Sequence, residues 1–162
     1  MIGKLVLVVL ALSTGALVAA IDALPAYVSP EHRSVLRGWL EFHPEFRLAL
    51  DSDCDCAESI ETTRKGQGGV WQPQPTFHPF YVTGDFNSDG KEDFAVVLLK
   101  GTQKFVAIFN GGQKQPGYLT RIDNSTALFF GPPRPAPYRL VMGAFFSEGV
   151  VLQPVGSGYA LH

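Results

Sequence analysis

The sequence has no concentrated basic region. Its 13 Lys and Arg residues are dispersed along 162 residues, and 15 Asp and Glu residues outnumber them, so the formal net charge at pH 7 is −2. A nucleic-acid-binding surface needs clustered cations that neutralise phosphates, and an anionic membrane attracts clusters of the same kind. We therefore expect no nucleic-acid partner and, once the N-terminal segment is removed, no membrane partner.

Catalytic signatures are also missing. The sequence contains no G-x-S-x-G motif, no phosphate-binding loop and no Cys-His signature, and its four histidines, at positions 32, 43, 78 and 162, have no H-x-x-x-H spacing. His78 lies in the aromatic, proline-bounded segment TFHPFY, where packing is its expected role. An active site would have to come from residues that folding brings together, with Glu148 and His78 as candidates, so we expect a non-catalytic protein.

Cysteine is scarce, with Cys54 and Cys56 as the only two. In an exported protein an even count indicates a disulfide, and the short ring between these two would be strained and easily reduced. The alternatives are a redox role, a disulfide that stabilises the local structure, and a pair of buried thiols. We favour the last two over a redox role.

The cysteines lie in DSDCDCAESIE, in which Asp51, Asp53 and Asp55 alternate with other residues and Glu58 follows. Their alternation resembles that of a cation site, but position six from Asp51 is Cys56 where a glycine would be needed, and no apolar strand follows directly. We expect a polar loop whose acids cap helix ends.

The first twenty residues, MIGKLVLVVLALSTGALVAA, combine Lys4, an apolar stretch from Leu5, and small residues at Ala19 and Ala20. This pattern is typical of a secretory signal peptide. We predict a signal peptide over residues 1–20 and a periplasmic or secreted protein. The alternative is an uncleaved anchor, because the apolar stretch to Ile21 approaches the length of a membrane-spanning helix.

Residues 21–162 are enough for one domain with its own core. Ser29-Pro30-Glu31 is a good helix start, and Pro44 should end that helix. Apolar residues recur between them at helical spacing, namely Val35, Leu36, Trp39, Leu40 and Phe42. We predict further short helices over Glu45–Leu50 and over Ala57–Arg64, the latter stopped by the glycines of KGQGG.

From Thr76 onward the pattern changes to short strands. Phe94–Leu99 is a continuous apolar run that favours a strand covered on both faces, and Phe105–Phe109 follows as its hairpin partner. Further strands are expected around 80–83, 126–130, 138–142, 149–153 and 159–161. We predict a single α+β domain, with N-terminal helices packed on a mainly antiparallel β-sheet.

The stretch GDFNSDGKEDFAVVLL, residues 84–99, places acids directly before the apolar strand. Counting from Asp85, oxygen-bearing side chains occupy positions one, three, five and nine, which are Asp85, Asn87, Asp89 and Asp93, with Gly90 at position six. Calcium takes about six to eight oxygen ligands, and a glycine allows a sharp turn. The main-chain oxygen of Lys91, at position seven, is a further candidate ligand.

An EF-hand would need a glutamate at position twelve, but that position is Val96, inside the strand. The stretch GDFNSDGKEDFAV instead resembles the calcium loops of FG-GAP and VCBS repeats. The resemblance implies a calcium-bound β-hairpin whose ligands are Asp85, Asn87, Asp89, the Lys91 carbonyl and Asp93. Only one copy is present, which excludes a full propeller. The alternative is a solvated turn of Asn, Asp, Ser and Gly.

These observations lead to two functional hypotheses. The first is an exported, non-catalytic calcium-binding domain that engages a protein or a cell-envelope polymer. The second is a periplasmic inhibitor or immunity-type protein that acts on an enzyme or a toxin.

Export can be tested directly. Expressed in a Gram-negative host, the protein should be recovered from the periplasm with its N-terminus near Ile21, because the apolar segment and small residues before it suit signal peptidase. Intact-mass analysis of the fractions measures this. Full-length protein in the membrane pellet would identify an anchored protein instead.

Overall fold

The computed structural model describes residues 24–66, 72–123, 127–131, 137–145 and 149–162. The predicted signal peptide and Glu148 therefore lie outside the described residues. In the described part of the chain, no helix has the length and apolar character needed to cross a membrane.

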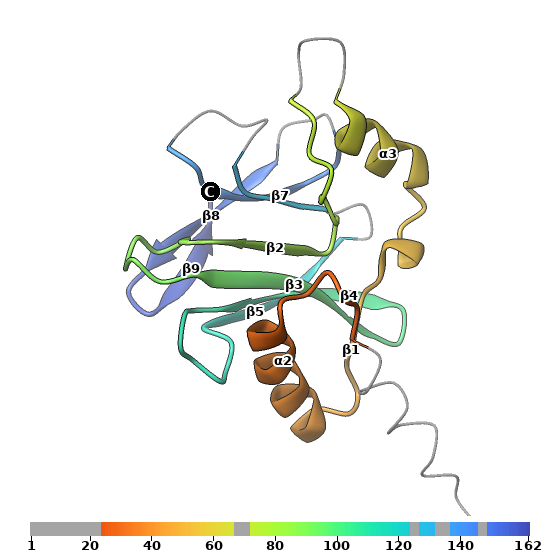
Figure 1. The fold of residues 1–162 in the computed structure, drawn as a ribbon. Helices are drawn as coiled ribbons and strands as arrows, with labels where there is room; N and C mark the ends of the chain where they lie inside the picture. The colour runs from red at the N-terminus through yellow and green to blue at the C-terminus, as the bar shows by residue number, and fades with distance from the viewer. Residues whose placement is uncertain (1–23, 67–71, 124–126, 132–136, 146–148) are drawn as a thin grey trace, which may run out of the picture.

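The described chain forms two antiparallel β-sheets and two α-helices (Figure 1). The helices are α2 (Pro30–Phe42) and α3 (Ala57–Lys65), with a short 3₁₀-helix, η1 (Asp51–Asp53), before α3. The strands are β1 (Arg47–Leu48), β2 (Tyr81–Gly84), β3 (Asp93–Lys100), β4 (Gln103–Phe109), β5 (Tyr118–Ile122), β6 (Ala127–Phe129), β7 (Leu140–Gly143), β8 (Val150–Val155) and β9 (Gly158–Leu161). The prediction of antiparallel strands with helices is confirmed, but the fold is mainly β and has two sheets where one was expected.

Strand β3 lies at the centre of the first sheet. It pairs with β4 along one edge through the predicted hairpin, and β4 pairs in turn with β5. The other edge of β3 is shared: β2 covers its first half, with Tyr81 opposite Val96, and β1 covers its second half, with Leu48 opposite Leu98. All of β3 is buried except Lys100.

The burial of β3 on both faces explains its unbroken apolar run. Phe94, Val96 and Leu98 belong to a buried cluster with Leu36, Trp39 and Leu40 of α2. The alternate residues Ala95, Val97 and Leu99 belong to a different cluster, with residues of β6 to β9. In a strand, successive side chains point to opposite faces. The prediction of a strand covered on both sides is therefore confirmed.

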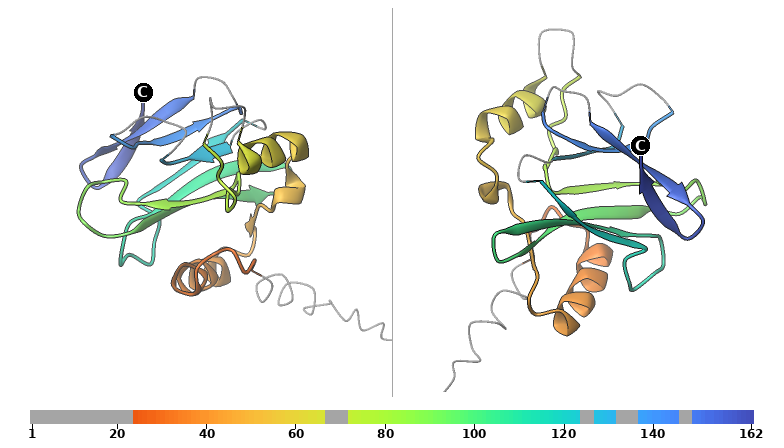
Figure 2. Two further views of the ribbon diagram at one scale, coloured as in Figure 1. Left: turned by 45° about the horizontal axis from the view of Figure 1, so that its top comes forward. Right: turned by 180° about the vertical axis from the view of Figure 1, so that it is seen from behind.

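The second sheet has the order β6-β7-β8-β9. In the left view of Figure 2 its blue strands lie over the green strands of the first sheet, and α2 lies on the opposite side of the first sheet. Ile60 of α3 packs in a smaller cluster with Phe77, Phe129 and Val141, on the other face of the second sheet.

Helix α2 begins and ends where the sequence predicts. The Ser29 hydroxyl accepts a hydrogen bond from the His32 amide at 3.2 Å, and Pro30 occupies the first turn. The helix ends at Phe42, two residues before Pro44. Helix α3 spans the predicted range and one further residue, Lys65, and is followed by Gly66, which has a positive φ of 76°.

The structure differs from the sequence-based prediction at two places, one where a predicted helix is a strand and one where a strand was not predicted. A helix over Glu45–Leu50 is wrong, because this segment supplies β1 and the amide of Ala49 donates to the Val97 carbonyl at 2.9 Å. Pairing with β3 satisfies backbone groups that a helix of six residues would leave unpaired at its ends. Strand β5 was not predicted, because its five residues, YLTRI, alternate only weakly between polar and apolar.

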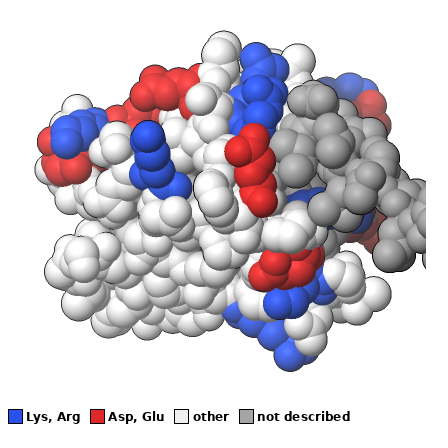
Figure 3. Space-filling model, turned by 90° about the horizontal axis from the view of Figure 1, so that it is seen from below, with Lys and Arg blue, Asp and Glu red and all other residues white. Residues whose placement is uncertain are grey.

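Charged side chains are dispersed over the surface. On the face in Figure 3, Lys and Arg groups stand apart from one another, several of them next to Asp or Glu, and a wide area carries neither charge. The described ion pairs include a local one, between Lys65 and Glu61 within α3, and long-range ones, as between Lys100 and Glu45.

Candidate functional site

The acidic loop, residues 85–92, connects β2 to β3 and forms the predicted turn of a β-hairpin, with Gly84 opposite Asp93. Its backbone is tightly folded: Ser88 and Gly90 both have positive φ, of 61° and 81°. Glycine adopts this conformation without strain, whereas serine does so rarely.

The side-chain oxygens of the loop bind its own backbone. Asp85 accepts from the amides of Asp89 and Gly90 at 3.0 and 2.9 Å. Asn87 accepts from the same Asp89 amide at 2.9 Å, so its oxygen lies close to that of Asp85. Asp89 accepts from the Lys91 amide at 2.9 Å. The three predicted ligands are thus brought together around the centre of the loop.

Asp93 has a different environment. It is fully buried, and its carboxylate accepts from the Phe86 amide at 2.9 Å and from the Gly111 amide at 2.7 Å. It therefore joins the acidic loop to the turn between β4 and β5. The contact is close, since a Cβ on Gly111 would lie 2.6 Å from the Lys91 Cβ and 2.9 Å from the Glu92 carbonyl oxygen.

The loop's charge acts on a buried neighbour. The Tyr159 hydroxyl donates to the Asn110 side chain at 2.7 Å. Burial raises the pKa of Tyr159, and the carboxylates of Asp93, Asp89 and Asp85 raise this pKa further. The described ion pairs include none of these three carboxylates. Negative charge thus accumulates here, and no described cationic side chain forms an ion pair with it.

The donor atoms fit a hard cation. They are carboxylate, amide and main-chain oxygens, and an oxygen that accepts one amide hydrogen bond retains a second lone pair. Within the described residues, however, no group of three or more His, Cys, Asp or Glu side chains is arranged to hold a metal ion. Asp85 and Asn87 face the Asp89 amide, and Asp93 faces Phe86 and Gly111. Calcium binding therefore stays a prediction.

A groove of about 840 Å³ lies beside the acidic loop. Its walls are the segment 72–78, residues 81–83 of β2, residues 128–130 at the end of β6, and the side chains of Tyr27 and Glu92. Glu92 belongs to the acidic loop, so the loop and the groove are contiguous.

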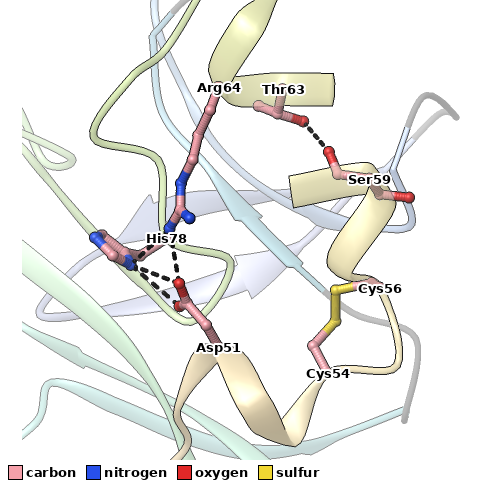
Figure 4. The surroundings of a disulfide bond; sticks show 7 residues. All are labelled: Asp51, Cys54, Cys56, Ser59, Thr63, Arg64 and His78. Carbon is pink, nitrogen blue, oxygen red and sulfur yellow. Dashed lines mark hydrogen bonds and ion pairs between the residues drawn. A yellow bond between two sulfur atoms is a disulfide. The ribbon is translucent and has the colours of Figure 1, made fainter. Parts of the chain in front are cut away.

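His78 lines the groove, and its imidazole contacts the Asp51 carboxylate and the Arg64 guanidinium (Figure 4). Its Nδ1–H donates to Asp51 at 2.9 Å, and Arg64 donates to the same carboxylate at 2.7 Å and to the Phe77 carbonyl at 2.9 Å. The Tyr27 ring stacks on the imidazole, with centroids 3.6 Å apart. His78 therefore packs against an aromatic ring, as its sequence context indicated, and also joins an ion-pair cluster.

Cys54 and Cys56 form a disulfide between η1 and α3, near the same cluster (Figure 4). Buried free thiols are thereby excluded. The acids around it pair with arginines: Asp51 with Arg64, and Asp53 with Arg47 through two hydrogen bonds of 2.7 Å. The Arg47 hydrogen bond holds the pKa of Asp53 below its usual value. These contacts agree with the expected polar loop.

A second chain of polar contacts starts at Tyr81, which also lines the groove. The Tyr81 hydroxyl accepts from the Ser29 amide at 3.3 Å and pairs with His32 Nδ1 at 2.8 Å. The other ring nitrogen of His32 faces Glu92 at 3.5 Å. Burial lowers the pKa of His32, against the opposing effect of the Glu92 and Glu31 charges. The neutral imidazole therefore bridges α2, β2 and the acidic loop.

Sequence reasoning missed Tyr27, His32 and Arg64. These residues lie apart from their partners in the sequence: Tyr81 is 49 positions after His32, and Arg64 is 13 positions after Asp51. No motif or spacing marks such pairs, which only the packing of the elements brings together.

The hydroxyl of Tyr27 is buried and has no hydrogen-bond partner among the described residues. Burial raises the pKa of Tyr27 to about 12, with a further contribution from the Asp51 charge that Arg64 partly offsets. A buried hydroxyl that makes no hydrogen bond lowers stability.

No family model matches this chain, and no curated protein or solved structure matches it at a significant level. The function must therefore be inferred from the residues and their geometry.

The contact between the turn and the loop can be tested at Gly111. Gly111→Ala should lower the free energy of unfolding by about 1–3 kcal/mol, because its Cβ would collide with Lys91 and Glu92. Gly38→Ala is the control: it lies inside α2 with open space around it, and should raise stability by about 0.5–1 kcal/mol. Urea titrations of both variants measure the difference. Equal effects would contradict the close approach.

Removing the hydroxyl should have opposite effects on stability at Tyr27 and at Tyr159, because, of the two, only the Tyr159 hydroxyl makes a hydrogen bond within the described residues. Tyr27→Phe should raise the free energy of unfolding by about 1 kcal/mol, because it removes a buried group that makes no hydrogen bond. Tyr159→Phe, the same chemical change, should lower it by about 1 kcal/mol, because it leaves Asn110 unpaired. Thermal melts compare the two variants. A loss of stability in Tyr27→Phe would show that its hydroxyl is in fact bonded.

Proposed function

We propose that residues 21–162 form an exported, non-catalytic domain, with its N-terminal helices packed on the sheet, that binds calcium and engages a protein or cell-envelope polymer. The calcium ligands would be oxygens of Asp85, Asn87, Asp89 and Asp93 together with the main-chain oxygen of Lys91. We place the protein in the periplasm or outside the cell.

The observation that carries this proposal is the buried carboxylate of Asp93 beside the other loop acids. An ionised carboxylate is costly to bury unless a cation or hydrogen bonds offset its charge. Two backbone amides meet Asp93, yet its charge still adds to those of Asp85 and Asp89 at Tyr159. Calcium would neutralise these charges together, and magnesium fits less well because it tends to retain several waters.

The non-catalytic part of the proposal is supported by the cluster around His78. Asp51 and Arg64 bind each other, and Arg64 also binds the Phe77 carbonyl, so their polar atoms serve to hold the segment 72–78 against α3. The stacked Tyr27 ring fixes His78 further. Such contacts suit a structural role.

The alternative is a periplasmic inhibitor or immunity-type protein acting on an enzyme or toxin. The groove favours it, because a largely uncharged cleft beside two strands suits a segment of another protein. In that case calcium would stabilise the domain without contacting the target.

Calcium binding should appear as added stability, because an unfolded loop cannot bring its oxygens together. The free energy of unfolding should rise by about 2.7 kcal/mol when free calcium is a hundredfold above its dissociation constant. Thermal melts in calcium and in chelator measure this. Asp89→Ala should abolish the gain, because it removes an exposed central ligand and leaves the buried Asp93 contacts intact.

The control is Asp123→Ala, which removes an exposed acid outside the loop and should keep the calcium effect. An identical wild-type midpoint in both buffers, with no heat of binding by calorimetry, would reduce the acidic loop to a solvated turn.

A further inference from the structure

The groove is bordered by the outer edges of β2 and β6, and these two segments meet where the Leu128 amide donates to the Pro79 carbonyl. Among the described strands, β2 pairs only with β3, and β6 pairs only with β7. Residues 81–83 of β2 and 128–130 at the end of β6 line the groove. An unpaired strand edge presents backbone donors and acceptors that another extended chain can pair with.

The hydrogen-bond pattern identifies which groups of β2 face outward. The Val97 amide donates to the Phe80 carbonyl at 3.0 Å, so Phe80 and Val97 form a hydrogen-bonded pair. Such pairs alternate along an antiparallel ladder, and Val82 and Gly84 therefore bond to β3. The amides and carbonyls of Tyr81 and Thr83 point away from β3, toward the groove.

Of these two residues, Thr83 offers the open edge. The Tyr81 amide is already directed at the His78 carbonyl, at 3.4 Å. Within the described chain, the amide and carbonyl of Thr83 have no hydrogen-bond partner. On the other border the Leu128 amide is occupied by the Pro79 carbonyl at 2.9 Å, which closes that end of the groove.

The chemistry of the lining restricts the occupant. Among the described residues that line the groove, none is Lys or Arg, and Glu92 is the one carboxylate. Its other side chains are aromatic, aliphatic, hydroxyl and amide groups, together with His78. An anionic ligand would find no cation among these described residues. An uncharged segment, or one with a single basic residue near Glu92, would be accommodated.

We propose that the groove binds an extended segment of a partner protein, which adds as a strand to the edge of β2 at Thr83. The Thr83 amide and carbonyl pair with the segment's backbone, and the aromatic lining accommodates its alternate side chains. At about 3.3 Å per residue, the four residues of β2 span about 13 Å. The inference rests on the proposed function only in that the domain binds a ligand without catalysis.

The probe is a random seven-residue peptide library displayed on phage, selected against residues 21–162. Synthetic peptides of the enriched sequences are then measured by fluorescence anisotropy. Thr83→Pro removes the outward amide and should weaken binding at least tenfold, while the bonds of Val82 and Gly84 to β3 remain. Thr83→Val keeps the amide and changes only the side chain, so its affinity should match the wild type within twofold.

A second measurement does not depend on the proline variant folding. Two versions of the best peptide are N-methylated, one at its odd-numbered and one at its even-numbered amides. Because alternate amides face β2 in a paired strand, one version should lose binding at least tenfold and the other should keep it. Equal affinity of the two versions, or of Thr83→Pro and the wild type, overturns the proposal.

Two further outcomes decide the ligand class and separate this inference from the proposed function. If no peptide is enriched, the proposal is overturned. Neutral tetra-N-acetylchitotetraose serves as a cell-envelope glycan probe. If it binds and a peptide fails to displace it, the proposal is also overturned. All selections are run with calcium and with chelator. Edge pairing without a calcium-dependent melt would reject the calcium site alone, and a calcium-dependent melt without peptide binding would reject the strand addition alone.

Discussion

The burial of β3 on both faces is the constraint on which the rest of the structure depends. One face of this strand meets α2 and the other meets the second sheet, so the strand belongs to both hydrophobic clusters. A strand in this position is expected to be apolar along its length, as β3 is from Phe94 to Leu99. Its backbone groups must also be paired on both edges, since water cannot reach them, and this is why β1, β2 and β4 all join it.

Asp93 is the first residue of this buried strand and shows how a carboxylate is accommodated next to apolar residues. Its carboxylate lies where the sheet ends and accepts two backbone amides from different turns. The hydrogen bonds partly replace the water that the carboxylate loses. The same residue therefore orders the acidic loop and anchors the turn between β4 and β5. Its buried charge is also what makes a cation at the loop chemically reasonable.

The features that could be predicted from the sequence are those set by local chemistry. The cap at Ser29, the end of α2 before Pro44 and the hairpin of β3 with β4 follow from short stretches. The segment 45–50 could not be assigned, because its conformation is decided by pairing with β3, about 50 residues later. The division into two sheets was likewise hidden, since strand patterns alone do not specify partners.

The same distinction applies to the candidate sites. The acidic loop stands out because its residues are contiguous and regularly spaced. The groove has no sequence signature, because its walls come from separate segments of the chain. His78 was singled out for its context, but its partners Asp51 and Arg64 became evident only when the fold placed them together.

The shared edge of β3 has a consequence for local unfolding. Two short strands cover this edge in succession, and they meet at Val97, whose amide donates to Phe80 while its carbonyl accepts from Ala49. Each strand covers only part of this edge, so detachment of one would expose only that part of the central strand to exchange with solvent or to aggregation. The contacts of Asp51 and Arg64 with the segment 72–78 link the chain after β1 to the chain before β2, and so oppose detachment of either strand.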